Sequence, residues 1–127
     1  MFIGNYFKKI KVKHKNHFFS GLSFNSLKCK KNNIFFAIRG SKIDGNKYIR
    51  NAIKNGARTI ISSNKKEGFK KDVLYISSKN VRKSLSETSF KYYRDIPKNL
   101  IAVTGTNGKS SIADFYFQIL KLNKKKV

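Results

Sequence analysis

The sequence has 127 residues, of which 39% are hydrophobic, so it can form one packed domain and part of a second. No apolar run approaches the roughly 20 residues that a membrane-spanning helix needs. The single cysteine, Cys29, excludes an internal disulfide or a cysteine-based metal cluster, and we expect it to be a half-buried, small apolar residue. Lysine and arginine total 29 against 6 acidic residues, giving a formal net charge of +23 spread along the chain, so we expect only nonspecific, salt-sensitive attraction to polyanions.

The first part of the chain contains strand-like runs separated by turn residues. Residues 18–24 are compatible with a strand, and the Lys-Lys-Asn-Asn segment at 30–33 predicts a turn. Residues 34–38 are apolar and β-prone, which suits a buried strand. Asp44 can cap a helix that ends at Gly56, because apolar residues recur between them at one-turn spacing.

Strands and helices continue to alternate after Gly56. Residues 58–62 and 73–76 are predicted strands, and Ser78 or Asn80 begins a helix that carries Val81, Leu85 and Tyr92 on its apolar face. Pro97 separates this helix from a predicted strand at 100–103, and a glycine loop then leads into a helix at 111–122. This alternation predicts an α/β fold.

The glycine loop is the most informative segment. It reads V-T-G-T-N-G-K-S-S over residues 103–111 and lies between the predicted strand and helix, as a phosphate-binding loop requires. Gly105 and Gly108 allow successive backbone N–H groups to converge on a phosphate, and the helix dipole adds to that field. Lys109 can contact the β- and γ-phosphates, and the Ser110 hydroxyl can bind Mg²⁺.

The loop departs from the strict G-x-x-x-x-G-K-[ST] pattern, because Val103 stands where the first glycine is expected. A purely structural glycine turn is therefore the alternative. Asp114 lies one turn into the following helix and is expected to face solvent, so no second acidic metal ligand is predicted in this chain.

The loop resembles the V-T-G-T-N-G-K-[ST]-[ST] nucleotide loop of the Mur ligases, ATP-dependent enzymes that add amino acids during peptidoglycan synthesis. The Thr106-Asn107 pair is most similar to the members that add a diamino acid to a UDP-N-acetylmuramoyl dipeptide. The resemblance implies that ATP and Mg²⁺ are cofactors, with Ser110 as the Mg²⁺ ligand. The implied ATP-binding residues are Thr104, Gly105, Thr106, Asn107, Gly108, Lys109, Ser110 and Ser111.

A second stretch is similar to the N-terminal domain of the same family. Residues 25–40 resemble the pattern D-S-R-x-V-x-P-G-D-[IL]-F-x-A-[LI]-x-G, with Lys31-Asn32 in place of its Pro-Gly turn, and residues 44–57 match D-G-x-x-[FY]-I-x-x-A-x-x-x-G-A. The resemblance implies that this region holds the UDP end of the substrate. The implied substrate-binding residues are Ser26, Asp44, Gly45 and Asn46.

The departures from the family pattern concern the same region. Asn25 and Leu27 stand where the family has Asp and Arg, and Asn46 stands where it commonly has His. Loss of the arginine removes a donor that can bind a diphosphate through two hydrogen bonds. A strand-end turn at 25–28, and a helix cap at Asp44, are the structural alternatives to substrate binding.

The resemblance implies two domains: residues 1–96 as the UDP-substrate-binding domain, and 97–127 as the first strand, loop and helix of the central ATPase domain. The family's other catalytic residues have no counterpart here, so we expect no catalytic residue in this chain and no ligase activity from it alone. We also expect a cytoplasmic monomer without a signal peptide. Other Mur-like ligases, of the fourth Mur type or the folylpolyglutamate synthetase type, and a non-enzymatic nucleic-acid-binding protein are the alternatives.

Overall fold

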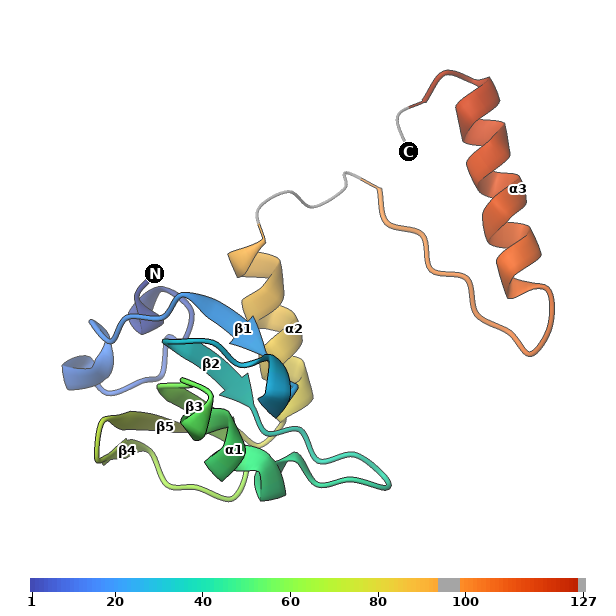
Figure 1. Cartoon of the computed structure of the whole chain (residues 1–127). Helices are drawn as coiled ribbons and strands as arrows, with labels where there is room; N and C mark the ends of the chain where they lie inside the picture. The colour runs from blue at the N-terminus through green and yellow to red at the C-terminus, as the bar shows by residue number, and fades with distance from the viewer. Residues whose placement is uncertain (94–98, 126–127) are drawn as a thin grey trace. The chain divides into compact units, whose positions relative to one another are not determined.

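A five-stranded mixed sheet with strand order β1-β2-β3-β5-β4 organises the first part of the chain (Figure 1). Neighbouring strands β1, β2, β3 and β5 pair in parallel, and only β4 is antiparallel, at one edge. The strands are β1 (Gly21–Ser23), β2 (Asn33–Phe36), β3 (Thr59–Ser62), β4 (Gly68–Lys70) and β5 (Val73–Ser77). The α/β class predicted from the alternating pattern is confirmed.

The computed structural model describes residues 1–93 and 99–125. It contains two compact units, Met1–Arg94 and Asp95–Val127. Pro97 and the predicted domain boundary at 96/97 lie outside the described residues, so the two-domain assignment stays a prediction. No helix among the described residues is long and apolar enough to cross a membrane.

Short 3₁₀ turns and three α-helices connect and follow the strands. The turns are η1 (Ile3–Asn5), η2 (Val12–His14), η3 (Ser26–Lys28) and η4 (Gly45–Tyr48). The helices are α1 (Ile49–Lys54), α2 (Val81–Tyr92) and α3 (Lys109–Leu122). The predicted helix after Asp44 is therefore a 3₁₀ turn that continues into α1, and Asp44 caps it by accepting a hydrogen bond from the backbone N–H of Asn46.

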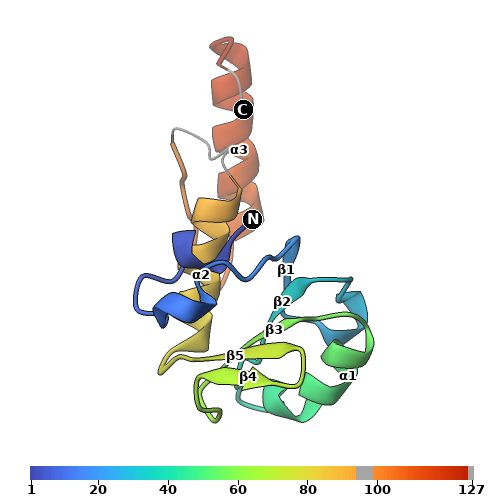
Figure 2. The same ribbon diagram turned by 90° about the vertical axis from the view of Figure 1, so that its left-hand side faces the viewer.

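The sheet separates two apolar cores because successive side chains of a strand point to opposite faces. Ile34 and Phe36 of β2 join the core beneath α2 and the N-terminal turns, whereas Phe35 and the following Ala37 join the core beneath α1. Figure 2 shows α1 and α2 on opposite sides of the sheet. All four residues of β2 and of β3 are buried, so the central residues of both strands are apolar without alternation. The buried polar residues at the ends of these strands are Asn33, Thr59 and Ser62.

Gly56 ends α1 as the sequence predicted, and the structure gives the reason. Its φ angle is +105°, and a Cβ atom added there would lie 2.8 Å from the backbone nitrogen of Lys31. The carbonyl of Gly56 accepts a hydrogen bond of 2.9 Å from the N–H of Asn32, which itself adopts a φ of 62°. The turn before β2 is thus held against the end of α1 at a separation that no side chain permits.

Three sequence expectations differ from the structure. Residues 100–103 form no strand, because no described strand pairs with them and an unpaired segment lacks ladder hydrogen bonds. The expected strand at 18–24 is limited to Gly21–Ser23, with an isolated bridge between Phe2 and Phe18. Cys29 is 6% exposed rather than half-buried, and burial raises the pKa of its thiol.

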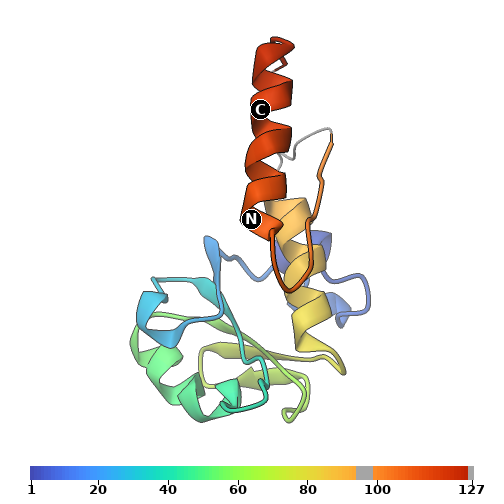
Figure 3. The same ribbon diagram turned by 90° about the vertical axis from the view of Figure 1, so that its right-hand side faces the viewer.

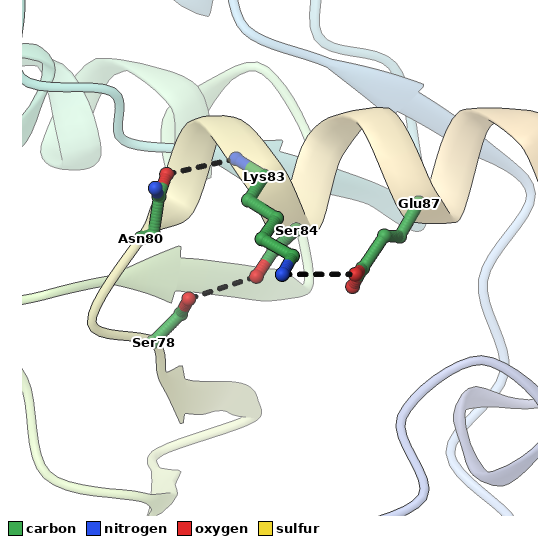
Figure 4. A network of polar contacts seen from close by, with 5 residues as sticks. All are labelled: Ser78, Asn80, Lys83, Ser84 and Glu87. Carbon is green, nitrogen blue, oxygen red and sulfur yellow. Dashed lines mark hydrogen bonds and ion pairs between the residues drawn. The ribbon is translucent and has the colours of Figure 1, made fainter.

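The start of α2 is fixed by polar contacts, and Asn80 rather than Ser78 is its cap (Figure 4). Asn80 Oδ1 accepts a hydrogen bond of 2.9 Å from the backbone N–H of Lys83. The Ser78 and Ser84 hydroxyls lie 2.8 Å apart. On the exposed face, Lys83 Nζ lies 3.9 Å from a Glu87 carboxylate oxygen.

We predict that Asn80→Ala lowers the free energy of unfolding by about 1 kcal/mol, because it leaves an N-terminal amide of α2 without its acceptor. Glu87→Gln, which removes only the exposed ion pair, should cost less than about 0.5 kcal/mol. Urea denaturation followed by circular dichroism measures both values. Equal losses for the two variants would contradict this assignment of the cap.

Candidate functional site

The glycine loop precedes α3 and is shaped by two glycines. Gly105 has a φ of 152° and Gly108 a φ of 75°, both in the region that favours glycine. Gly108 is the N-cap residue of α3, and its carbonyl accepts the first helical hydrogen bond, from the N–H of Ile112. The sequence prediction of a loop that ends in a helix is therefore confirmed, with the helix beginning at Lys109 rather than at Ser111.

The N-terminus of α3 has the properties of an anion site. No side chain caps it and its first turn contains no acidic residue, so the amides of Lys109, Ser110 and Ser111 have no partner within the helix. The positive end of the helix dipole lies at the same point. Residues 104–111 are all exposed, so an anion can reach these amides from solvent.

Lys109 places its ammonium group over the loop. Its Nζ donates hydrogen bonds to the carbonyl oxygen of Gly105 and, at 3.0 Å, to that of Thr106. No salt bridge between described residues involves Lys109, so its charge is not neutralised there. The cation, the uncapped amides and the two glycines together form a cradle that matches a phosphate group in charge and in donor character.

Ser110 is the residue that the loop offers to a magnesium ion. It occupies the second position of α3 and is exposed. Asp114 is also exposed, as expected, and accepts a hydrogen bond of 2.6 Å from Gln118 Nε2. No cluster of three His, Cys, Asp or Glu side chains occurs in the described parts of the chain. A hydroxyl ligand fits a magnesium ion that is held mainly by phosphates and water.

The residues predicted to hold the substrate follow the strands of the sheet. Ser26 begins η3, the turn that follows β1. Asp44 and Asn46 follow β2, and Ser62 ends β3. Because β1, β2 and β3 are parallel, their carboxyl ends lie at one edge of the sheet, where open α/β sheets bind ligands. The two predicted groups thus belong to one edge of the fold.

Ser26 is held by the helix that follows β2. Its hydroxyl accepts a hydrogen bond of 3.3 Å from Asn51 Nδ2, and its carbonyl accepts one of 2.9 Å from Asn55 Nδ2. Only 6% of Ser26 is exposed. Asn25 caps η3 by accepting a hydrogen bond from the backbone N–H of Leu27, whose side chain is 75% exposed. The turn is thus structurally fixed, and the substrate role of Ser26 stays a prediction.

Asp44, Gly45 and Asn46 form a tight turn joined to β3. The Asn46 amide donates to Asp44 Oδ1 at 2.7 Å, and Asn46 Oδ1 accepts a hydrogen bond of 2.6 Å from the Ser62 hydroxyl. A Cβ atom at Gly45 would lie 2.6 Å from the carbonyl oxygen of Ile38, so only glycine fits there. These contacts give all three residues a structural role, while their predicted substrate role stays untested.

Three further residues, Asn51, Asn55 and Ser62, support these side chains and were not predicted from the sequence. Ser62 is fully buried at the end of a predicted strand, and a hydroxyl at that position is the feature that could have identified it. Asn51 lies in α1 and Asn55, four positions later, is the C-cap residue of the same helix, so both residues lie on one side of it. The spacing of the two asparagines could be seen in the sequence. Their common partner, Ser26, could not, because it lies 25 and 29 positions away from them along the chain.

Asp44 should make stability depend on pH. The backbone N–H of Asn46, followed by its side-chain amide, lowers the pKa of the Asp44 carboxyl from its ordinary value. A lowered pKa means that the carboxylate stabilises the fold above the unfolded-state pKa, and that this contribution disappears as pH falls through the folded-state pKa. We therefore predict that the melting-temperature difference between the natural chain and Asp44→Asn is largest at neutral pH and shrinks on acidification. A difference that grew on acidification would contradict this assignment.

Comparisons with known proteins agree on a single family. A sequence model described as "Mur ligase family, catalytic domain" matches residues 18–97. The UDP-N-acetylmuramoyl-L-alanyl-D-glutamate--2,6-diaminopimelate ligase of Rickettsia prowazekii is 46% identical over 112 residues, which cover 88% of this chain and 23% of that protein. The enzyme of the same name from Fusobacterium nucleatum is 39% identical over 113 residues, covering 87% of this chain and 23% of that protein. The chain thus spans less than a quarter of the length of these relatives.

Solved structures share the fold. The MurF ligase from Thermotoga maritima, solved in complex with ADP, has a TM-score of 0.60 and 23% identity, covering 79% of this chain and 23% of that one. A UDP-N-acetylmuramoylalanyl-D-glutamyl-2,6-diaminopimelate--D-alanyl-D-alanyl ligase from Acinetobacter baumannii has the same TM-score at 17% identity, covering 81% of this chain and 23% of that one. At these identities the likeness concerns the fold alone.

Proposed function

Because the chain belongs to the Mur ligase family, we propose that it supplies the substrate-binding and nucleotide-binding parts of an ATP-dependent ligase of peptidoglycan synthesis. The reaction proposed for the whole enzyme joins a diamino acid to UDP-N-acetylmuramoyl-L-alanyl-D-glutamate. The names of the relatives at 39% and 46% identity support this choice over the fourth Mur type and the folylpolyglutamate synthetase type. A cytoplasmic monomer stays part of the proposal.

The chemistry of the proposal is the activation of a carboxylate. ATP would transfer its γ-phosphoryl group to the side-chain carboxylate of D-glutamate, and the amine of the diamino acid would then displace phosphate to form the peptide bond. Within this chain, the loop amides and the Lys109 ammonium group would stabilise charge on the phosphates. Mg²⁺, held in part by the Ser110 hydroxyl, would neutralise phosphate charge.

The observation that carries the nucleotide role is the combination of an uncapped α3 N-terminus with a lysine that reaches back over a two-glycine loop. A purely structural turn would leave neither an unpaired cation nor free amides at the same point. The N-terminal role is supported by Ser26, Asp44 and Asn46 lying at the carboxyl edge of parallel strands, where the family pattern places substrate contacts.

We predict that Lys109→Ala weakens ATP binding by roughly 10-fold to 100-fold, the usual effect of losing a hydrogen bond to a charged group. Lys121→Ala removes the same charge from the other end of α3 and should change the affinity by less than about twofold, since exposed charges contribute little. Isothermal titration calorimetry with Mg-ATP measures both. Equal weakening by the two variants would mean that ATP responds only to net charge, and the loop assignment would be wrong.

The substrate role of the η3 turn can be tested by restoring a missing group. Leu27 is 75% exposed and stands where the family has arginine. We predict that Leu27→Arg strengthens UDP binding by about tenfold, because a guanidinium can bind a diphosphate through two hydrogen bonds. Leu27→Lys adds the same charge without the paired donors and should give a smaller gain. If the two variants behave alike, or neither changes UDP affinity, the diphosphate does not lie at this turn.

A further inference from the structure

A cavity of about 750 Å³ lies on the α1 side of the sheet, next to β4 and β5. Its apolar lining consists of Ile49 and Ile53 from α1 and of Val73 and Tyr75 from β5. Ile49 and Val73 are buried, whereas Ile53 and Tyr75 are half-buried and so retain apolar surface that no other residue covers. Of the residues predicted from sequence to bind substrate, Asn46 alone lines this cavity. The helix and strands that carry these residues are drawn in Figure 3, where α1 is green.

Six cationic side chains line the same cavity, and they come from separate segments of the chain. One acidic residue, Asp72, is also present. In residues 1–93 and 99–125 the recorded salt bridge is Lys83–Glu87, so no described carboxylate pairs with any of the six. Two of the chain's five arginines are among them. The six are Lys47, Arg50, Arg58, Lys65, Lys70 and Lys71.

The half-buried ring of Tyr75 lines the same cavity as these cations. Tyr75 lies opposite Gly68 in the β4–β5 pair, so its partner residue in β4 has no side chain to cover it. A Cβ atom added at Gly68 would have no other heavy atom within 4 Å, so the space above Gly68 is open. A planar ring could therefore stack on Tyr75 while its charged substituents extend to the arginines.

We propose that this cavity binds a small anion that carries at least two phosphate groups and a planar ring, as a nucleotide does. Its volume falls within the range of small-molecule sites, and its apolar floor with a cationic rim matches an apolar ring joined to phosphates. Arginine supplies the paired donors that phosphate oxygens accept. The cations surround a hollow rather than following an extended stripe, which favours a compact ligand over a nucleic-acid strand. This proposal does not depend on the glycine loop.

The experiment uses the full chain with Lys109→Ala, which separates this cavity from the glycine loop. Amide ¹H–¹⁵N spectra are recorded at about 150 mM salt, where long-range attraction is screened, with ATP, tripolyphosphate or oligothymidylate added. ATP is expected to shift the amides of Arg50, Arg58 and Tyr75 and to bind more tightly than tripolyphosphate. Adding Arg50→Gln and Arg58→Gln should weaken ATP binding by about tenfold or more.

A matched control variant removes two positive charges at positions that do not line the cavity. Lys13→Gln with Arg82→Gln lowers the net charge by the same amount, and neither residue lines the cavity. This control should change ATP affinity by less than about twofold. Three results would overturn the proposal: equal weakening by the control pair, equal affinity for tripolyphosphate and ATP, or shifts at these amides with oligothymidylate but not with ATP. Unshifted amides at Arg50 and Arg58 with every probe would overturn it as well.

Discussion

The parallel pairing of β2 with both β1 and β3 is the constraint on which the rest of the first unit depends. β2 is buried on both faces, so its alternate side chains supply both cores, and both neighbouring strands run in its direction. The connections that leave β1, β2 and β3 therefore emerge at the same edge. Ser26 and Asn46, distant in sequence, lie at that edge because of strand direction, and α1 contacts the turns that carry both.

Local sequence patterns predicted the buried strands well because their cause is itself local in sequence. The runs at 34–38 and 73–76 are apolar, and the run at 58–62 has β-branched residues at its centre, as is typical of strands buried within a parallel sheet. The glycine loop was predictable for a related reason: the φ angles of Gly105 and Gly108, and the helix start at Lys109, depend on neighbouring residues. Its shape therefore needs no distant partner.

The features that the sequence did not reveal depend on distant partners. β4 is three residues long, contains a glycine and a lysine, and exists because β5 offers it a hydrogen-bonding edge. Ile3, Ile10 and Phe19 are fully or almost fully buried, yet the N-terminal segment has no regular period, since it consists of 3₁₀ turns and an isolated bridge. Likewise, no pattern indicated that the cations around Tyr75 would enclose a cavity. The expected strand at 100–103 was wrong for the converse reason, because an apolar run is not a strand without a neighbour.

The two edge strands of the sheet, β1 and β4, affect how readily the molecule associates with copies of itself at high concentration. β1 and β4 are each three residues long, and β4 ends at Lys70, next to Lys71 in the turn. An exposed sheet edge invites strands of other molecules to add to it, and short edges with like charges oppose that addition. The same lysines that surround the cavity therefore also discourage edge-to-edge polymerisation, so replacing them wholesale would risk fibrous aggregates even with the fold intact.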